Sequence, residues 1–165
     1  MSTPYPRPIP LVRSRWPAFL TDGLLSAGLS AATLIWRGQK DSGSAAAPLN
    51  AVSHIVWPRA AFRRDDVSLR HTATGTALHV ASSMLWGGLY SWIRHRRLRP
   101  TPGNAVTDAV VVSGVAAVVD FKLVPPRLTP GFERRLSRPG VAWVYVALAA
   151  GLALGGLKEL SDEQR

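Results

Sequence analysis

Seven ionisable or amide side chains lie within or beside apolar stretches of this 165-residue chain: Asp22, Asn50, His54, His71, His79, Asp108 and Asp120. If those stretches cross a membrane, each ionisable group costs on the order of 2.5–3.5 kcal/mol, so it should face a bundle interior or an aqueous path. Histidine changes charge near neutral pH, and a cluster of such groups could therefore relay protons. We treat the first five as a candidate intramembrane polar cluster and the last two as secondary candidates.

The deepest of these residues is His79, which lies eight residues after His71 in one apolar stretch. Two histidines eight apart on a helix are about 12 Å apart, so they cannot bind one metal ion together. A metal site would also need His54 and an aspartate from another helix, and HExxH is absent, so we predict no metal. Two interpretations of His79 stay open: a packed histidine hydrogen-bonded to Ser or Asn, and a proton or metal ligand.

The two secondary candidates have structural alternatives. Asp108 falls in the first turn of a predicted helix, where a carboxylate complements the positive end of the helix dipole. Asp120 falls at the end of the same helix, where it can reach outward or pair with Lys122 or an arginine.

Sequence motifs of common enzyme classes are absent, among them GxSxG, GxGxxG and CxxC. The chain has no cysteine, which excludes disulfides, thiolate metal sites and thiol nucleophiles. A membrane hydrolase that uses serine and histidine is a minor alternative. The sequence therefore predicts a protein that is not an enzyme and needs no cofactor.

The elements that must position these residues are long apolar stretches. Residues 71–93 contain no Asp, Glu, Lys or Arg and are flanked by arginines. As a helix rising about 1.5 Å per residue, this stretch can cross a hydrocarbon core of roughly 30 Å. Similar stretches cover residues 17–36, 104–121 and 139–157. We predict an all-α membrane bundle, residues 17–157, with four transmembrane helices.

The remaining segments are shorter or polar. Residues 48–57 have helical spacing but are too short to span, so we expect a re-entrant or interfacial helix that docks against residues 71–93. Residues 1–16 form a basic, proline-rich tail, and residues 158–165 form a polar tail. A cleaved secretory signal peptide is the alternative interpretation of residues 17–36.

Small residues recur four apart on the predicted spans, at Gly23 and Ala27 and again at Ala147, Gly151 and Gly155. Such spacing lets a second helix approach closely, which drives helix association in lipid. We therefore expect close helix packing, either with another copy of the chain or with a partner membrane protein.

The net charge of +10 indicates either nucleic acid or anionic lipid as a partner. The arginines crowd at the ends of the apolar stretches, which favours the lipid bilayer and its anionic headgroups and argues against nucleic acid. Four arginines in the short loop after residue 93 place both termini in the cytoplasm by the positive-inside rule. A soluble basic protein is a further alternative.

Several short motifs resemble a family of small uncharacterised proteobacterial multi-pass inner-membrane proteins. They are APLNA with SH at residues 47–54, the pattern of His71, Gly75 and His79, and RLTPGFE at residues 127–133. The resemblance spans most of residues 20–155 and implies a bacterial inner-membrane location, with no activity to carry over. We predict a non-enzymatic packing or accessory protein of the membrane; the alternative is a small transporter or proton- or ion-conducting unit that uses the polar cluster.

Overall fold

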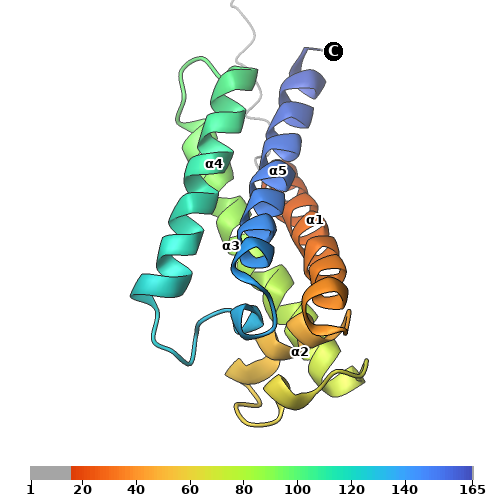
Figure 1. Ribbon diagram of the computed structural model, residues 1–165. Helices are drawn as coiled ribbons and strands as arrows, with labels where there is room; N and C mark the ends of the chain where they lie inside the picture. The colour runs from red at the N-terminus through yellow and green to blue at the C-terminus, as the bar shows by residue number, and fades with distance from the viewer. Residues whose placement is uncertain (1–15, 165) are drawn as a thin grey trace, which may run out of the picture.

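Four long helices run side by side in the computed structural model, which describes residues 16–164 (Figure 1). The predicted N-terminal tail therefore lies, except for Trp16, outside the described residues. The described residues contain no strand, which confirms the all-α prediction. The helices are α1 (Trp16–Ser42), α3 (Thr74–His95), α4 (Pro102–Val118) and α5 (Arg138–Glu163).

Short elements gather at one end of the bundle, below the C-terminal end of α1 in Figure 1. We call this the α2 end, and the opposite end, at residues 96–101, the 96–101 end. Helix α2 packs against the start of α3, which is entered through the π-helical turn η3. The short elements are α2 (Ala47–Val52), η1 (Ser53–Ile55), η2 (Ala61–Arg63), η3 (Leu69–Ala73), η4 (Val119–Leu123) and η5 (Phe132–Arg134).

Helix α1 continues past the predicted end at residue 36 because its last turns carry their own polar support. Arg37 donates to the carboxylate of Asp41, one turn later, at 2.7 Å. Asp41 also accepts from the backbone N–H and the hydroxyl of Ser137, at 3.0 and 2.9 Å. Ser137 is the N-cap of α5, so this contact fixes the end of α1 to the beginning of α5.

The end of α5 also differs from the prediction of a polar tail after residue 157. The helix continues to Glu163, and its last turns include an ion pair between Lys158 and Asp162 at 2.7 Å. Opposite charges four residues apart support helix, so polar composition alone did not end it.

Close backbone contacts occur where the sequence has glycine. A Cβ on Gly87 of α3 would lie 2.7 Å from the Cα of Gly23 on α1. A Cβ on Gly151 of α5 would collide with the backbone of Ser26, and one on Gly75 of α3 would collide with the carbonyl of Leu49 on α2. Helix α1 therefore packs tightly against α3 and α5, while α4 packs against α5 and α3.

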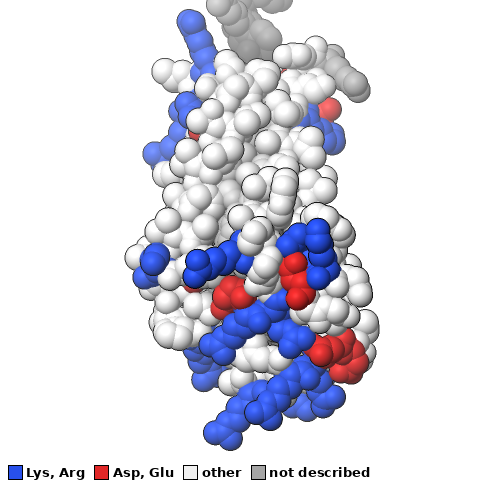
Figure 2. Space-filling model, viewed as in Figure 1, with Lys and Arg blue, Asp and Glu red and all other residues white. Residues whose placement is uncertain are grey.

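Polar side chains share the interior of the bundle with apolar ones, and many large apolar side chains lie on its surface. Fully buried side chains on α1 include Asp22, Ser26 and Ser30. Large apolar side chains on the four long helices point outward; they include Leu24, Ile35, Trp36, Leu85, Trp92, Val110, Val111, Trp143 and Leu154. On the face drawn in Figure 2, a broad uncharged band separates the charged residues of the two ends.

Two helices are long and apolar enough to cross a membrane, Ala18–Ser42 and Arg138–Glu163. Helix α4 has only 17 residues before it continues into the π-helical turn η4. The interior of α3 contains serines and glycines as well as His79, which lowers its hydropathy. Of the four predicted spans, two therefore meet the length and composition of a membrane helix.

Candidate functional site

The deepest candidate, His79 on α3, faces Ser30 on α1. The ring Nε2 lies 2.9 Å from the hydroxyl oxygen of Ser30. That hydroxyl lies 2.6 Å from the carbonyl oxygen of Ser26, to which it donates. The Ser30 oxygen then accepts from Nε2–H, so the ring carries a proton on Nε2. The geometry is therefore that of a packed histidine with a serine partner.

A cavity of about 130 Å³ lies beside this pair, between α1, α3 and α5. Its polar lining includes Ser30 on α1, Ser82 and Ser83 near His79 on α3, and Asp120 and Tyr145 from η4 and α5. A buried water needs two to four polar partners and occupies about 30 Å³ in the liquid, so the cavity has room and partners for a few waters. Trp86, Phe132 and Leu148 supply part of its apolar wall.

The carboxylate of Asp120 accepts a hydrogen bond of 2.7 Å from the phenol of Tyr145 on α5. Asp120 lies in the π-helical turn η4, and Tyr145 packs edge-on against Phe121 of the same turn. Among the described residues, Asp120 does not form the expected pair with Lys122 or an arginine. The reason is that the π-helical turn points the carboxylate toward α5, where the phenol is the nearest donor.

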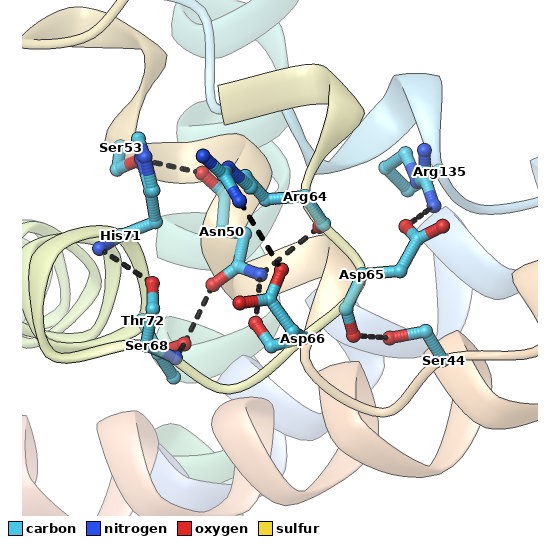
Figure 3. A network of polar contacts seen from close by, with 10 residues as sticks. All are labelled: Ser44, Asn50, Ser53, Arg64, Asp65, Asp66, Ser68, His71, Thr72 and Arg135. Carbon is cyan, nitrogen blue, oxygen red and sulfur yellow. Dashed lines mark hydrogen bonds and ion pairs between the residues drawn. The ribbon is translucent and has the colours of Figure 1, made fainter. Parts of the chain in front are cut away.

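Asn50 is the centre of a polar network at the α2 end (Figure 3). Its amide nitrogen donates to the carbonyl oxygens of Arg64 and Asp66, at 3.0 and 2.9 Å. Its side-chain carbonyl accepts from the hydroxyl of Thr72 at 2.7 Å. The side chain is fully buried and both of its amide hydrogens are used. Asn50 therefore holds the loop before α3 to α2.

The two other histidines belong to the same end of the bundle. His71 Nδ1 lies 3.2 Å from the hydroxyl of Ser53. The Nδ1–H of His54 donates to the carbonyl of Ala51 at 2.9 Å, and its ring lies 4.9 Å from the Phe62 ring. The Nε2 atom of His54 is buried without a hydrogen-bond partner among the described residues.

Asp22 on α1 is buried in a different place, nearer the 96–101 end. It is fully inaccessible, and neither carboxylate oxygen has a hydrogen-bond partner within residues 16–164. A Cβ on Gly155 of α5 would collide with its Oδ1. The nearest charges are Arg94, which also lies over the Tyr90 ring, and its ion-pair partner Glu159.

Asp108, the other secondary candidate, forms a two-point ion pair with Arg97 across the 96–101 loop. Arg97 Nε donates to Oδ2 at 2.7 Å, and Nη2 contacts Oδ1. Hydrogen bonding to this carboxylate raises the pKa of Arg97 above its ordinary value. The pair joins α3 to α4 and leaves no polar atom of Asp108 directed at the cavity.

The five residues of the predicted cluster thus lie in three separate places. Asn50, His54 and His71 lie at the α2 end, His79 lies at the cavity, and Asp22 lies between α1 and α5. No group of three or more His, Cys, Asp or Glu in the described part of the chain could hold a metal ion. Ser30 and Tyr145, which complete the cavity site, were not among the predicted site residues. For Ser30, the sequence signal was the spacing of serines four apart on α1.

The His79–Ser30 pair has the members of a nucleophile and base, but its geometry does not support acyl transfer. Ser30 is fully inaccessible, and its proton is directed at a backbone carbonyl rather than at the ring. Among residues 16–164, no carboxylate forms a hydrogen bond with Nδ1 to orient the ring, as a catalytic triad requires.

Comparisons with known proteins add no relative: no protein-family model, no curated protein and no solved structure matches the chain.

Proposed function

We propose that this chain is an integral protein of the bacterial inner membrane, with four spanning helices and an accessory, non-enzymatic role in which it packs with lipid and partner helices. The observation that carries the proposal is the exposure of large apolar side chains on every long helix, together with the burial of several polar ones. Serines and Asp22 are buried, whereas leucines, valines and tryptophans of all four long helices are exposed. Exposed apolar surface of this extent is unfavourable in water and favourable in lipid.

The energetic argument applies to α3 and α4 as well as to the two more apolar helices. Leu85 and Trp92 on α3 are 68% and 53% exposed, and Val110 on α4 is 60% exposed. Each is a side chain whose burial is worth about 1.5–3 kcal/mol, and lipid would supply that burial. Ser83, Ser91 and His79 of α3 are buried in the bundle, which is where a membrane helix places its polar groups.

The charge distribution supports the same proposal. Arginines and carboxylates occupy the two ends, and the face in Figure 2 is uncharged between them. Arg96 lies 4.3 Å from the centroid of the Trp92 ring, the pairing expected of an interfacial anchor. In this proposal the arginine-rich 96–101 end, with both termini, faces the cytoplasm.

The absence of native cysteine makes a direct test simple, because each introduced cysteine is the only thiol. Leu85→Cys places a thiol in the middle of α3, and Leu98→Cys and Val67→Cys place thiols at fully or largely exposed positions at opposite ends. In sealed inverted vesicles and in whole cells, a membrane-impermeant maleimide should label the two end positions from opposite sides. It should not label Leu85→Cys from either side.

The result that overturns the membrane proposal is equally direct. If Leu85→Cys reacts as fast as Leu98→Cys in the absence of detergent, α3 is exposed to water. Sedimentation provides the independent check, because a chain that stays in the supernatant without detergent is not integral. Labelling of Leu98→Cys from the periplasmic side would reverse the proposed orientation alone.

A second function, proton or ion conduction, is favoured by the cavity between His79 and the Asp120–Tyr145 pair. These polar groups line one cavity of about 130 Å³, which has room for waters that could carry a proton. The test is a pH-driven flux in proteoliposomes, which His79→Ala should abolish. His95→Ala, at the 96–101 end, is the matched control and should leave the flux unchanged.

A further inference from the structure

An open apolar groove of about 820 Å³ runs along the outer surface between α4 and α5. Its walls are made mainly of small side chains and valines, including Val106, Gly114, Ala117, Ala149 and Ala153. It is distinct from the cavity at His79, although Tyr145 contributes to both. The charged lining residues, Glu133 and Arg138, lie at or beside the start of α5, at the α2 end of the groove.

The length of the groove accommodates hydrocarbon chains. From Val106 to Phe121 it follows 15 residues of helix, or roughly 22 Å at about 1.5 Å per residue. The length exceeds one leaflet, about 15 Å of hydrocarbon, so an acyl chain can lie in it fully extended.

The charged end of the groove has one unpaired group of each sign. Glu133 is half-buried; its Oε1 accepts a long hydrogen bond of 3.4 Å from Thr129, and its Oε2 is buried without a partner among the described residues. Arg138 is exposed and forms no ion pair or hydrogen bond within residues 16–164. A carboxylate and a guanidinium at the mouth of an apolar groove complement a headgroup that carries an ammonium and a phosphate.

We propose that this groove binds a zwitterionic phospholipid with a primary ammonium, phosphatidylethanolamine. The acyl chains lie between α4 and α5, Arg138 binds the phosphate, and the ammonium donates to the Glu133 carboxylate. The primary ammonium matters because it can donate hydrogen bonds to this half-buried carboxylate, whereas the quaternary ammonium of phosphatidylcholine cannot. An anionic lipid would place a glycerol or a second negative charge beside Glu133. This inference rests on the proposed membrane location.

The experiment is native mass spectrometry of the full chain in detergent, with phosphatidylethanolamine, phosphatidylcholine or phosphatidylglycerol of identical acyl chains added in turn. Phosphatidylethanolamine should be retained roughly fivefold more than either of the others, the size expected of one partly exposed polar contact. Glu133→Gln should remove that preference, and Arg138→Gln should weaken retention of all three lipids.

Two glycine substitutions distinguish lipid binding in the groove from non-specific binding of lipid to the rest of the protein surface. A Cβ on Gly114, in the groove, or on Gly28, on α1, would meet no atom within 4 Å, so a side chain can be introduced at both exposed positions without a backbone clash. Gly114→Leu should reduce lipid retention, whereas Gly28→Leu should not. Equal retention of the three lipids by the native chain, or full retention by Gly114→Leu, would overturn the proposal. So would a dimer that excludes lipid and dissociates on Gly114→Leu, because a second copy would then occupy the groove.

A different measurement, thiol labelling, tests the membrane proposal. Water labelling of Leu85→Cys would reject the membrane location whatever lipid is bound. Protection of Leu85→Cys together with no lipid preference would reject the lipid site and leave the membrane location standing.

Discussion

Thr72 donates a hydrogen bond of 2.7 Å to the side-chain carbonyl of Asn50, and this contact joins the start of α3 to α2. The Thr72 hydroxyl oxygen also accepts from the backbone N–H of Ser68 at 2.9 Å, and Ser68 in turn accepts from the N–H of His71. The network in Figure 3 therefore satisfies the first backbone donors of η3 and fixes where α3 begins. Its polar atoms are used in hydrogen bonds that hold the fold together, so we do not propose a functional site in this network.

Asn50→Asp should destabilise the protein by about 2–4 kcal/mol, because it removes a buried donor and sets a carboxylate against two backbone carbonyls. The carbonyls are those of Arg64 and Asp66. Denaturant unfolding in detergent, followed by tryptophan fluorescence, measures the loss. Asn104→Asp is the matched control: its amide makes only a long contact of 3.4 Å near a helix N-terminus, so its cost should stay below about 0.5 kcal/mol. Equal losses of stability in the two variants would show that the Asn50 network does not hold the loop before α3 to α2.

Gly131→Ala should cost more than Gly43→Ala, although both glycines have positive φ, 86° and 72°. Alanine at either position must adopt a left-handed backbone conformation, which costs about 1–2 kcal/mol. At Gly131 the added Cβ would also lie 2.6 Å from the carbonyl oxygen of Ala51 and 2.6 Å from Nδ1 of His54, whereas at Gly43 it would meet nothing. Thermal unfolding of the two variants in one detergent measures the difference. Equal destabilisation would show that η5 does not pack rigidly on α2.

The helices could be predicted from the sequence because uncharged stretches of about 20 residues are a strong signal for helix in any apolar environment. Their ends were harder to predict. The end of α1 depends on Asp41 meeting Ser137, a contact across 96 residues, and no local pattern marks it. The continuation of α5 to Glu163 depended on charges that composition alone assigned to a tail.

The site was predicted less well than the helices, because spacing along one helix says nothing about which face meets which neighbour. His79 was identified as the deepest polar residue, but its partner Ser30 is 49 residues away on α1. Asp120 points at Tyr145 because the helix passes through a π-helical turn there, and the sequence of η4 carries no signal of that turn. Grouping Asp22 with Asn50 followed from their residue types, and the fold places them at different levels of the bundle.

Gly151→Ala should destabilise the bundle, because the added Cβ would collide with the backbone of Ser26 at the crossing of α5 and α1. Overpacking of this kind costs about 1–3 kcal/mol. Gly28→Ala adds the same methyl group on α1 where no atom lies within 4 Å, so it should be neutral or stabilise by up to about 1 kcal/mol through helix propensity. Denaturant midpoints of the purified variants measure both. If Gly151→Ala unfolds like the native chain but loses self-association, the small-residue face of α5 serves another copy rather than α1.

Asp22→Asn should stabilise the folded protein, because the native carboxyl group is fully buried and has no hydrogen-bond partner among residues 16–164. Asparagine has the same shape and removes the cost of burying an ionisable group, so the expected gain is about 1–2 kcal/mol. Asp108→Asn is the contrasting change, since it breaks the two-point ion pair with Arg97 and should destabilise. Unfolding midpoints in one detergent compare the two. A loss of stability in Asp22→Asn equal to that of Asp108→Asn would mean that the Asp22 carboxylate is held by Arg94 as a structural ion pair. A gain would mark Asp22 as a residue that the fold does not need, and therefore as the first position to test in any flux or partner assay.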